Sequence, residues 1–309
     1  MRNWGERFGL IDMRTRAGAR ARGDAEHIAL TAEIAMPLRR YAELPPWEQA
    51  TARAAAVALT LDAAVVAGTA AARLHGIDVP GTGQPAVDVL HVDGKRPGGR
   101  PLKSSGIRQR YAWLPDDGVL VEHGMRVTTI GRTLRDVCAF EGLVAGVIAI
   151  DSVRRRMPEV PLGRWHEELL VGPRFKGAAV VREALALSIR NSGSAAETRA
   201  RLLLRGLVGI VTIVAQAEII DPETRRRYYV DFLINGWLVL EIDGDVKYDG
   251  VTYGPVDEII REERRREKNL QNMGKVVVRT NDPREAPAVV AGALARYGYM
   301  GPMGPMGRR

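Results

Sequence analysis

Residues 228–244 read YYVDFLINGWLVLEIDG. Two apolar runs rich in β-forming residues flank an Asn-Gly pair, which is the strongest short-range signal for a β-hairpin. The same stretch contains three carboxylates, Asp231, Glu241 and Asp243, at positions where apolar residues would pack better. It therefore predicts a hairpin with an unusual concentration of negative charge.

The register of this hairpin decides which carboxylates meet, because strand side chains alternate between the two faces of a sheet. A two-residue Asn-Gly turn would place Asp231 and Glu241 on opposite faces. A three-residue loop over 234–236 would instead pair Asp231 with Val239 and place all three carboxylates on one face. The two-residue turn is the stronger general signal, and the carboxylates are the reason to favour the three-residue loop.

Carboxylates gathered on a half-buried sheet face destabilise it unless a positive charge lies between them. Neither strand of the hairpin has a Lys or Arg on that face. A divalent cation would resolve the conflict, and Mg²⁺ commonly takes one or two carboxylates together with waters and a substrate phosphate. Such an ion can activate water for phosphodiester cleavage. Alternatively, the face is exposed to solvent and the acids keep a sheet edge soluble. The hairpin alone leaves both readings open.

A fourth carboxylate, Glu197, follows Ser194 at the spacing of a capping box, in which it would accept from the Ser194 amide. This role needs no catalysis. The helix that begins there contains Arg199, Arg201 and Arg205, which could bind phosphates or form a solvated face.

Four sequence blocks in this half of the chain resemble the very-short-patch-repair-like endonuclease family, within the PD-(D/E)xK nuclease superfamily. They are SAAETRARLLL at 194–204, VDF at 230–232, LEIDGDVKYD at 240–249, and REKNLQNMG followed by VVVR at 266–279. The resemblance covers about residues 190–285, with the blocks in the family's order. It implies a restriction-endonuclease-like core and a Mg²⁺-dependent site that hydrolyses phosphodiester bonds, with Mn²⁺ able to substitute.

The resemblance also implies roles for single residues. Asp231 and Glu241 would be metal ligands, and Glu197 would be a further ligand that assists the metal or a second ion. The superfamily's usual lysine, two residues after the second acid, is replaced here by Asp243. Lys247 would then take over the polarisation of the attacking water. Arg266 matches one block and would contact phosphate or pair with an acid of the site.

The N-terminal half has a resemblance of its own. Residues 62–77 (DAAVVAGTAAARLHGI) and 126–139 (RVTTIGRTLRDVCA) are similar to the AbiEi-like antitoxin family of type IV toxin–antitoxin systems. In that family these blocks follow a winged helix-turn-helix that binds DNA. The segment before Trp47 is short and irregular, with RRYAEL (39–44) as a remnant of that element.

Length and composition bear on the number of domains, the kind of partner, the presence of disulfides or zinc, and the location of the chain. A chain of 309 residues with a formal charge of +8 suits two domains and a polyanionic partner. One cysteine and five scattered histidines offer no disulfide and no zinc site. The absence of a long apolar run and of a signal peptide predicts a cytoplasmic protein that does not enter a membrane.

We therefore expect a mixed α/β fold in five parts: a basic arm with a degenerate helical segment (1–46), an AbiEi-like α/β domain (47–160), a linker helix region (161–190), a nuclease domain (191–297) and a disordered Gly-Pro-Met tail (298–309). Within the first part, we expect a helix over 24–41. The leading hypothesis is a Mg²⁺-dependent DNA endonuclease, acting alone, as a homodimer or with a toxin partner, and without a small-molecule cofactor. The alternative is a non-catalytic, antitoxin-like DNA-binding regulator with a vestigial nuclease fold.

Overall fold

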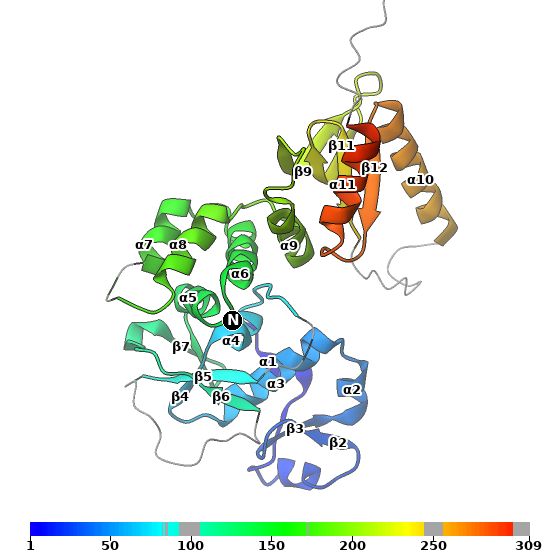
Figure 1. Cartoon of the computed structure of the whole chain (residues 1–309). Coiled ribbons are helices and arrows are strands. Elements are labelled where there is room, and N and C mark those ends of the chain that lie inside the picture. The colour runs from blue at the N-terminus through cyan, green and yellow to red at the C-terminus, as the bar shows by residue number, and fades with distance from the viewer. Residues whose placement is uncertain are drawn as a thin grey trace, which may run out of the picture. The chain divides into compact units, whose positions relative to one another are not determined.

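The computed structural model describes residues 1–81, 83, 86–92, 106–170, 172, 174–243 and 256–298, with the backbone alone for 256–260. The chain divides into two compact units, Met1–Ile189 and Arg190–Arg309. Both mix helices with sheets, as the sequence predicts, and Figure 1 labels their elements. The boundary falls one residue before the expected start of the nuclease domain. No helix among the described residues has the length and apolar character needed to cross a membrane.

The first 46 residues are not an arm, because they fold into a small sheet that packs on the rest of the N-terminal unit. Their elements are α1 (Trp4–Phe8), β1 (Ile11–Asp12), η1 (Gly18–Ala21), β2 (His27–Ala29), β3 (Ile34–Pro37) and α2 (Leu38–Glu43), with strand order β1-β3-β2. Trp4 and Phe8 are buried, and Trp4 Nε1 donates to the Leu74 carbonyl at 2.8 Å. The prediction of a helix over 24–41 is wrong, since Ile34–Pro37 form strand β3. A short buried apolar run of this kind fits a strand as well as a helix.

A five-stranded sheet forms the centre of the N-terminal unit. Its elements are α3 (Pro46–Thr60), β4 (Ala64–Val66), α4 (Gly68–Leu74), β5 (Val87–His91), β6 (Ile107–Gln109), η2 (Asp116–Gly118), β7 (Val119–Glu122) and β8 (Met125–Thr128), with strand order β6-β5-β4-β8-β7. The Ala-rich sequence of residues 62–75 favours one helix, but the segment is divided at Gly68, which has φ +58° and where a Cβ would lie 3.2 Å from Asp88. Its first part pairs instead as β4.

Four helices complete this unit: α5 (Ile130–Glu141), α6 (Leu143–Arg156), α7 (Leu162–Leu170) and α8 (Ala178–Leu187). The spacing of apolar residues over 133–156 favours one helix, but the helix is broken at Gly142, which has φ +85°. Residues 161–190 are not a linker, because α8 packs against α5 and α6 and buries Val181 and Leu185.

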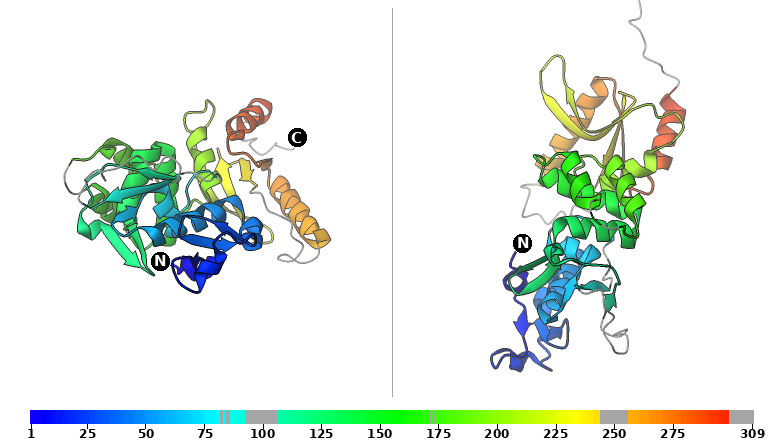
Figure 2. Two further views of the ribbon diagram at one scale, coloured as in Figure 1. Left: turned by 90° about the horizontal axis from the view of Figure 1, so that it is seen from below. Right: turned by 90° about the vertical axis from the view of Figure 1, so that its left-hand side faces the viewer.

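In the part of the C-terminal unit that the structure describes, three helices accompany a four-stranded mixed sheet. Its elements are α9 (Ala195–Leu204), β9 (Ile213–Ile220), β10 (Arg227–Ile234), β11 (Leu238–Ile242), α10 (Val256–Asn272), β12 (Val276–Thr280) and α11 (Ala286–Tyr297). The strand order is β12-β11-β10-β9, with β11 and β12 parallel and the other pairs antiparallel. Figure 2 shows these elements from two further sides. The order of elements along the chain is α-β-β-β-α-β-α, and β10 and β11 form the hairpin that the sequence predicts. The tail from 299 onward lies outside the described residues.

Candidate active site

The hairpin β10–β11 has a register that neither expectation included. Ile234 pairs with Leu238, so that Trp237 is an extra residue on the β11 side. Asn235 and Gly236 have φ +51° and +75°, as a tight Asn-Gly turn requires, and the Trp237 amide donates to the Ile234 carbonyl at 3.2 Å. The Trp237 carbonyl accepts from Val276 of β12 at 3.0 Å. The Asn-Gly turn thus forms, and a one-residue bulge after it changes the register.

The side chain of Asn235 holds this turn in place. Its Oδ1 accepts from the amides of Val211 and Thr212 at 2.8 and 3.1 Å, and its Nδ2 donates to the Gly209 carbonyl at 2.7 Å. The loop before β9 is therefore tied to the hairpin, which leaves the register little freedom to slip.

Asp231 and Glu241 meet as a result of this register. Phe232 pairs with Leu240, and one residue further along this register Asp231 lies directly opposite Glu241. In the expected register Asp231 pairs with Val239, so that Asp231 and Glu241 would be only diagonal neighbours. Glu241 Oε2 accepts from the Asp231 amide at 3.3 Å, and Asp231 Oδ2 accepts from the Ile242 amide at 2.8 Å. The two carboxylates share one face, although the loop that brings them together is not the expected one.

Glu197 lies behind this pair and reaches it through Gln216. Ser194 caps α9 by accepting from the Glu197 amide at 3.1 Å. The Glu197 carboxylate accepts from the Gly193 amide at 2.8 Å, one residue earlier than the expected capping box. Gln216 Nε2 donates to Glu197 Oε2 at 2.8 Å and to Asp231 Oδ1 at 3.2 Å. One amide group therefore bridges two of the predicted site acids.

The backbone of Gln216 adopts a conformation that is uncommon for a residue with a side chain. Its φ is +49° in the middle of β9, and the pairing of β9 with β10 skips the position between Ala215 and Ala217. Such conformations cost free energy and concentrate at functional sites. The distortion accompanies an amide aimed at Glu197 and Asp231. Gln216 is the main site residue that sequence reasoning missed, and its signal was the one amide in a strand whose other polar residue is Glu218.

Positive charge at the carboxylate pair comes from α10. Arg266 NH2 donates to Glu241 Oε1 and to the Tyr229 carbonyl, both at 2.6 Å. The same guanidinium contacts Glu263 at 3.3 Å. Neither strand of the hairpin supplies this cation, and the pairing of Arg266 with an acid of the site is one that the resemblance implied. A metal ion is not needed to balance Glu241 in this state.

Asp243 is neutralised in a similar way by the neighbouring strand. Arg279 of β12 lies 3.6 Å from Asp243 and also pairs with Glu263. Because Asp243 faces Arg279, it lies at the edge of the site. Lys247, the expected substitute for the superfamily lysine, lies outside the described residues.

The remaining predicted residues lie on α9. Arg199 and Arg201 are half-buried, and Arg205 is exposed at the end of the helix. The amide and guanidinium of Arg284 lower the pKa of Asp282, and the charge of Arg199 contributes to the same shift. Arg199 therefore lies near the segment that leads into α11. A DNA contact by these three arginines stays a prediction.

Two acids of the site have raised pKa values. Burial raises the pKa of Glu241, the charge of Asp231 raises it further, and Arg266 opposes both. Burial also raises the pKa of Glu197, against the hydrogen bonds from Gln216 and Gly193. Both carboxylates are thus held where their charged forms are poorly solvated, which is common at functional sites and also occurs in structural ion-pair networks.

The donor set fits Mg²⁺ as a pair of carboxylates. Asp231 and Glu241 adjoin, and two carboxylates suffice for an ion that keeps its remaining waters. Among the described residues, no three acidic, histidine or cysteine side chains converge as a metal-binding group. Glu197 is therefore placed to orient Asp231 through Gln216, and its expected role as a ligand is not supported by the described geometry.

The raised pKa of Glu197 leads to a stability prediction. Folding raises the pKa of such a carboxyl above the pKa that it has in the unfolded protein. The group then stabilises the folded state at pH values below the pKa of the unfolded state, and this stabilisation is lost as the pH rises through the pKa of the folded state. Glu197→Gln cannot ionise, so we expect the variant to be more stable than the wild type at pH 7.5, by up to about 1 kcal/mol or about 2–4 °C in Tm. At pH 4 the two proteins should unfold at similar temperatures.

Thermal unfolding of both proteins at the two pH values measures this difference. Glu262→Gln, which changes an exposed carboxylate on α10, is the matched control and should change little at either pH. A larger difference at pH 4 than at pH 7.5 would contradict the assignment.

Comparisons with protein-family models, with curated proteins and with solved structures gave no match to this chain.

Proposed function

We propose that the chain is a Mg²⁺-dependent DNA endonuclease whose site is formed by Asp231 and Glu241, with an antitoxin-like N-terminal unit that directs it to DNA or to a partner. The observation that supports this most directly is the meeting of the two carboxylates across β10 and β11. The order of the four sequence blocks and the net charge of +8 agree with it.

The side chains around the pair have distinct roles in this proposal. Asp231 and Glu241 would hold Mg²⁺, which when bound supplies a Lewis acid and a water of lowered pKa. Gln216 fixes the Asp231 carboxylate by donating to Oδ1, while Glu197 fixes Gln216. These contacts prepare the site before substrate arrives, and such preorganisation contributes strongly to catalysis.

Arg266 neutralises Glu241 and is available for a phosphate. Its guanidinium is half-buried and contacts Glu241 at 2.6 Å. Guanidinium groups bind phosphate oxygens with two parallel hydrogen bonds. In the proposed reaction Arg266 exchanges Glu241 for the scissile phosphate, which frees the carboxylate and balances the charge of the substrate.

A second candidate function is an antitoxin-like regulator that binds DNA without cutting it. It is favoured by the ion pairs that already satisfy Glu241 and Asp243 through Arg266 and Arg279. It also agrees with the replacement of the superfamily lysine by Asp243.

Incubation of the full chain with supercoiled plasmid separates the two functions. The nuclease proposal expects nicked or linear DNA with Mg²⁺ or Mn²⁺ and none with EDTA. If the chain is a regulator, we expect unchanged plasmid with Mg²⁺, with Mn²⁺ and with EDTA, together with salt-sensitive DNA binding in a mobility-shift assay. Binding without any metal-dependent cleavage would reject the nuclease.

A further inference from the structure

A basic and aromatic cavity in the N-terminal unit has no role in the proposed reaction. It has a volume of about 770 Å³ and lies between the segment after β6, one side of α5 and the residues before α8. Among the described residues, the basic side chains that line it are Arg110, Arg132, Arg135, Arg174 and Lys176, against one acid, Asp136. The lining therefore has a clear excess of positive charge.

Two of these cations are already neutralised by buried acids. Arg132 Nε donates to Asp136 at 3.0 Å, and Arg110 Nε donates to Asp88 at 2.8 Å. These buried pairs stabilise the wall of the cavity. The cations that remain for a ligand are those on the rim.

Those cations are Arg135, Arg174 and Lys176. The Arg135 guanidinium lies 3.9 Å from the ring centroid of Phe175, a cation–π contact that sets its direction. Arg174 and Lys176 flank the same ring in sequence and are exposed. An anionic group at the rim would meet all three charges.

The cavity also presents aromatic faces to solvent. Trp113 is 60% exposed and Tyr111 is 55% exposed, although both line the cavity. Exposed aromatic side chains next to arginines are the arrangement that stacks unpaired bases while cations bind the backbone. A base-paired duplex cannot offer its base faces in this way.

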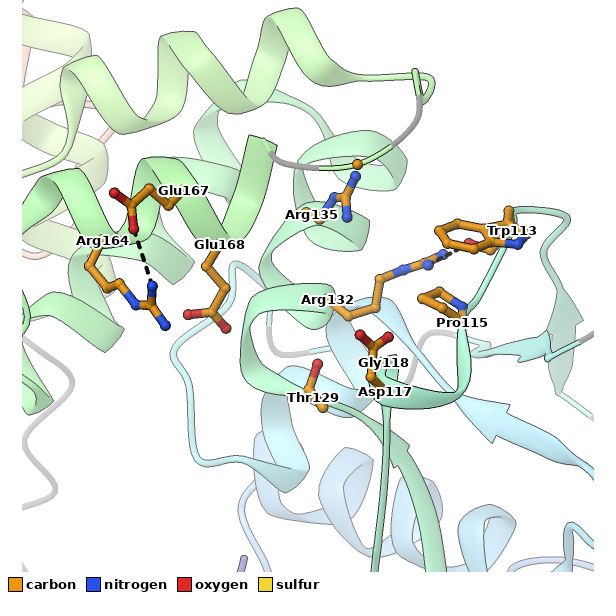
Figure 3. A pocket seen from close by; sticks show the side chains of 11 residues that line it. Trp113, Pro115, Asp117, Gly118, Thr129, Arg132, Arg135, Arg164, Glu167 and Glu168 are labelled. Carbon is orange, nitrogen blue, oxygen red and sulfur yellow. Dashed lines mark hydrogen bonds and ion pairs between the residues drawn. The ribbon is translucent and has the colours of Figure 1, made fainter.

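An adjoining cavity shares one wall with this one but differs in charge. Figure 3 shows Trp113, Arg132 and Arg135 on that common wall, with Glu167 and Glu168 across from them. The described residues that line this second cavity include three arginines and three acids, whose charges balance. We therefore expect an anion to bind in the basic cavity and not in this second one.

We propose that the basic cavity binds a nucleotide unit, with its base stacked on Trp113 and its phosphate held by Arg135, Arg174 and Lys176. The ligand is either a nucleotide within a single strand or a free nucleotide, since both offer a base face next to a phosphate. This site is independent of the carboxylate pair in the C-terminal unit.

The test uses the full chain in EDTA, so that metal-dependent cleavage does not contribute. A fluorescein-labelled single strand of twelve thymidines is titrated by anisotropy, and unlabelled strand, duplex or thymidine monophosphate is added as competitor. We expect Trp113→Ala to weaken binding about 5- to 150-fold, the range for loss of one stacked base. Arg135→Gln should also weaken it and lower the salt slope by about 0.7.

Matched variants exclude indirect effects. Trp47→Ala removes another exposed tryptophan and Arg182→Gln another exposed arginine, both outside the cavity, and both should bind as the wild type does. Trp113→Phe keeps a stacking face and should recover most of the affinity. Competition by the monophosphate identifies a free nucleotide as the ligand, and competition by the strand alone identifies a nucleic acid. Wild-type affinity in both Trp113→Ala and Arg135→Gln, or no binding by the wild type, overturns the proposal.

Discussion

Replacing Asp231 with Asn is expected to reduce plasmid cleavage by about 100- to 1000-fold or more while DNA affinity changes little. The change removes one negative charge from the carboxylate pair and keeps the shape of the side chain. Losses of this size follow when a group that stabilises charge at a reaction centre is removed. The rate of plasmid nicking in Mg²⁺ and a mobility shift in EDTA measure the two quantities.

The control for this change is Glu262→Gln, which removes a carboxylate from the exposed side of α10 in the same unit. It should cleave at the wild-type rate. Cleavage by Asp231→Asn at the wild-type rate, in protein free of contaminating nuclease, would remove the main support for the active site. It would leave the nucleotide site of the N-terminal unit untouched.

Replacing Phe232 with Ala is expected to destabilise the C-terminal unit by about 3–5 kcal/mol, the range for a large aromatic side chain deleted from a core. Phe232 is 1% exposed and pairs with Leu240 in β11 and with Ala215 in β9. Hydrogen exchange of the intact chain measures the effect. Peptides from β10 and β11 should lose protection, while peptides from α5 and α6 should keep it.

Tyr229→Ala is the matched control, because this aromatic residue lies on the same strand and is 58% exposed. It should leave the exchange of β10 nearly unchanged. Equal loss of protection in both units after Phe232→Ala would show that the units do not unfold separately.

Sequence patterns predicted most of the C-terminal unit, because its strands are apolar and its helices begin and end at strong signals. The Ser194 cap, the Asn-Gly turn and Gly274 after α10 are local features, and local features can be read from a single sequence. That Asp231 and Glu241 share one face of the hairpin was inferred from chemistry. The loop that produces it was not, because a bulge depends on contacts with β12 and with the loop before β9.

The first 46 residues were harder to read for a related reason. Their strands are two to four residues long, and none shows a full period of alternation. They are ordered through distant partners, such as Leu74 for Trp4. The pairing of Arg266 with a site acid could be expected only from the resemblance, since its partner Glu241 is 25 residues away in sequence.

Because Trp237 is an additional residue in the hairpin, the site depends on whether the loop between Ile234 and Leu238 has an odd or an even number of residues. A deletion of one residue between Ile234 and Leu238 would turn every following side chain of β11 by half a period, and Glu241 would leave the face of Asp231. An insertion of one residue would do the same, whereas a change by two would restore the face. Relatives of this chain that keep the two acids should therefore vary in this loop by even numbers of residues, and an odd change should accompany loss of the acids.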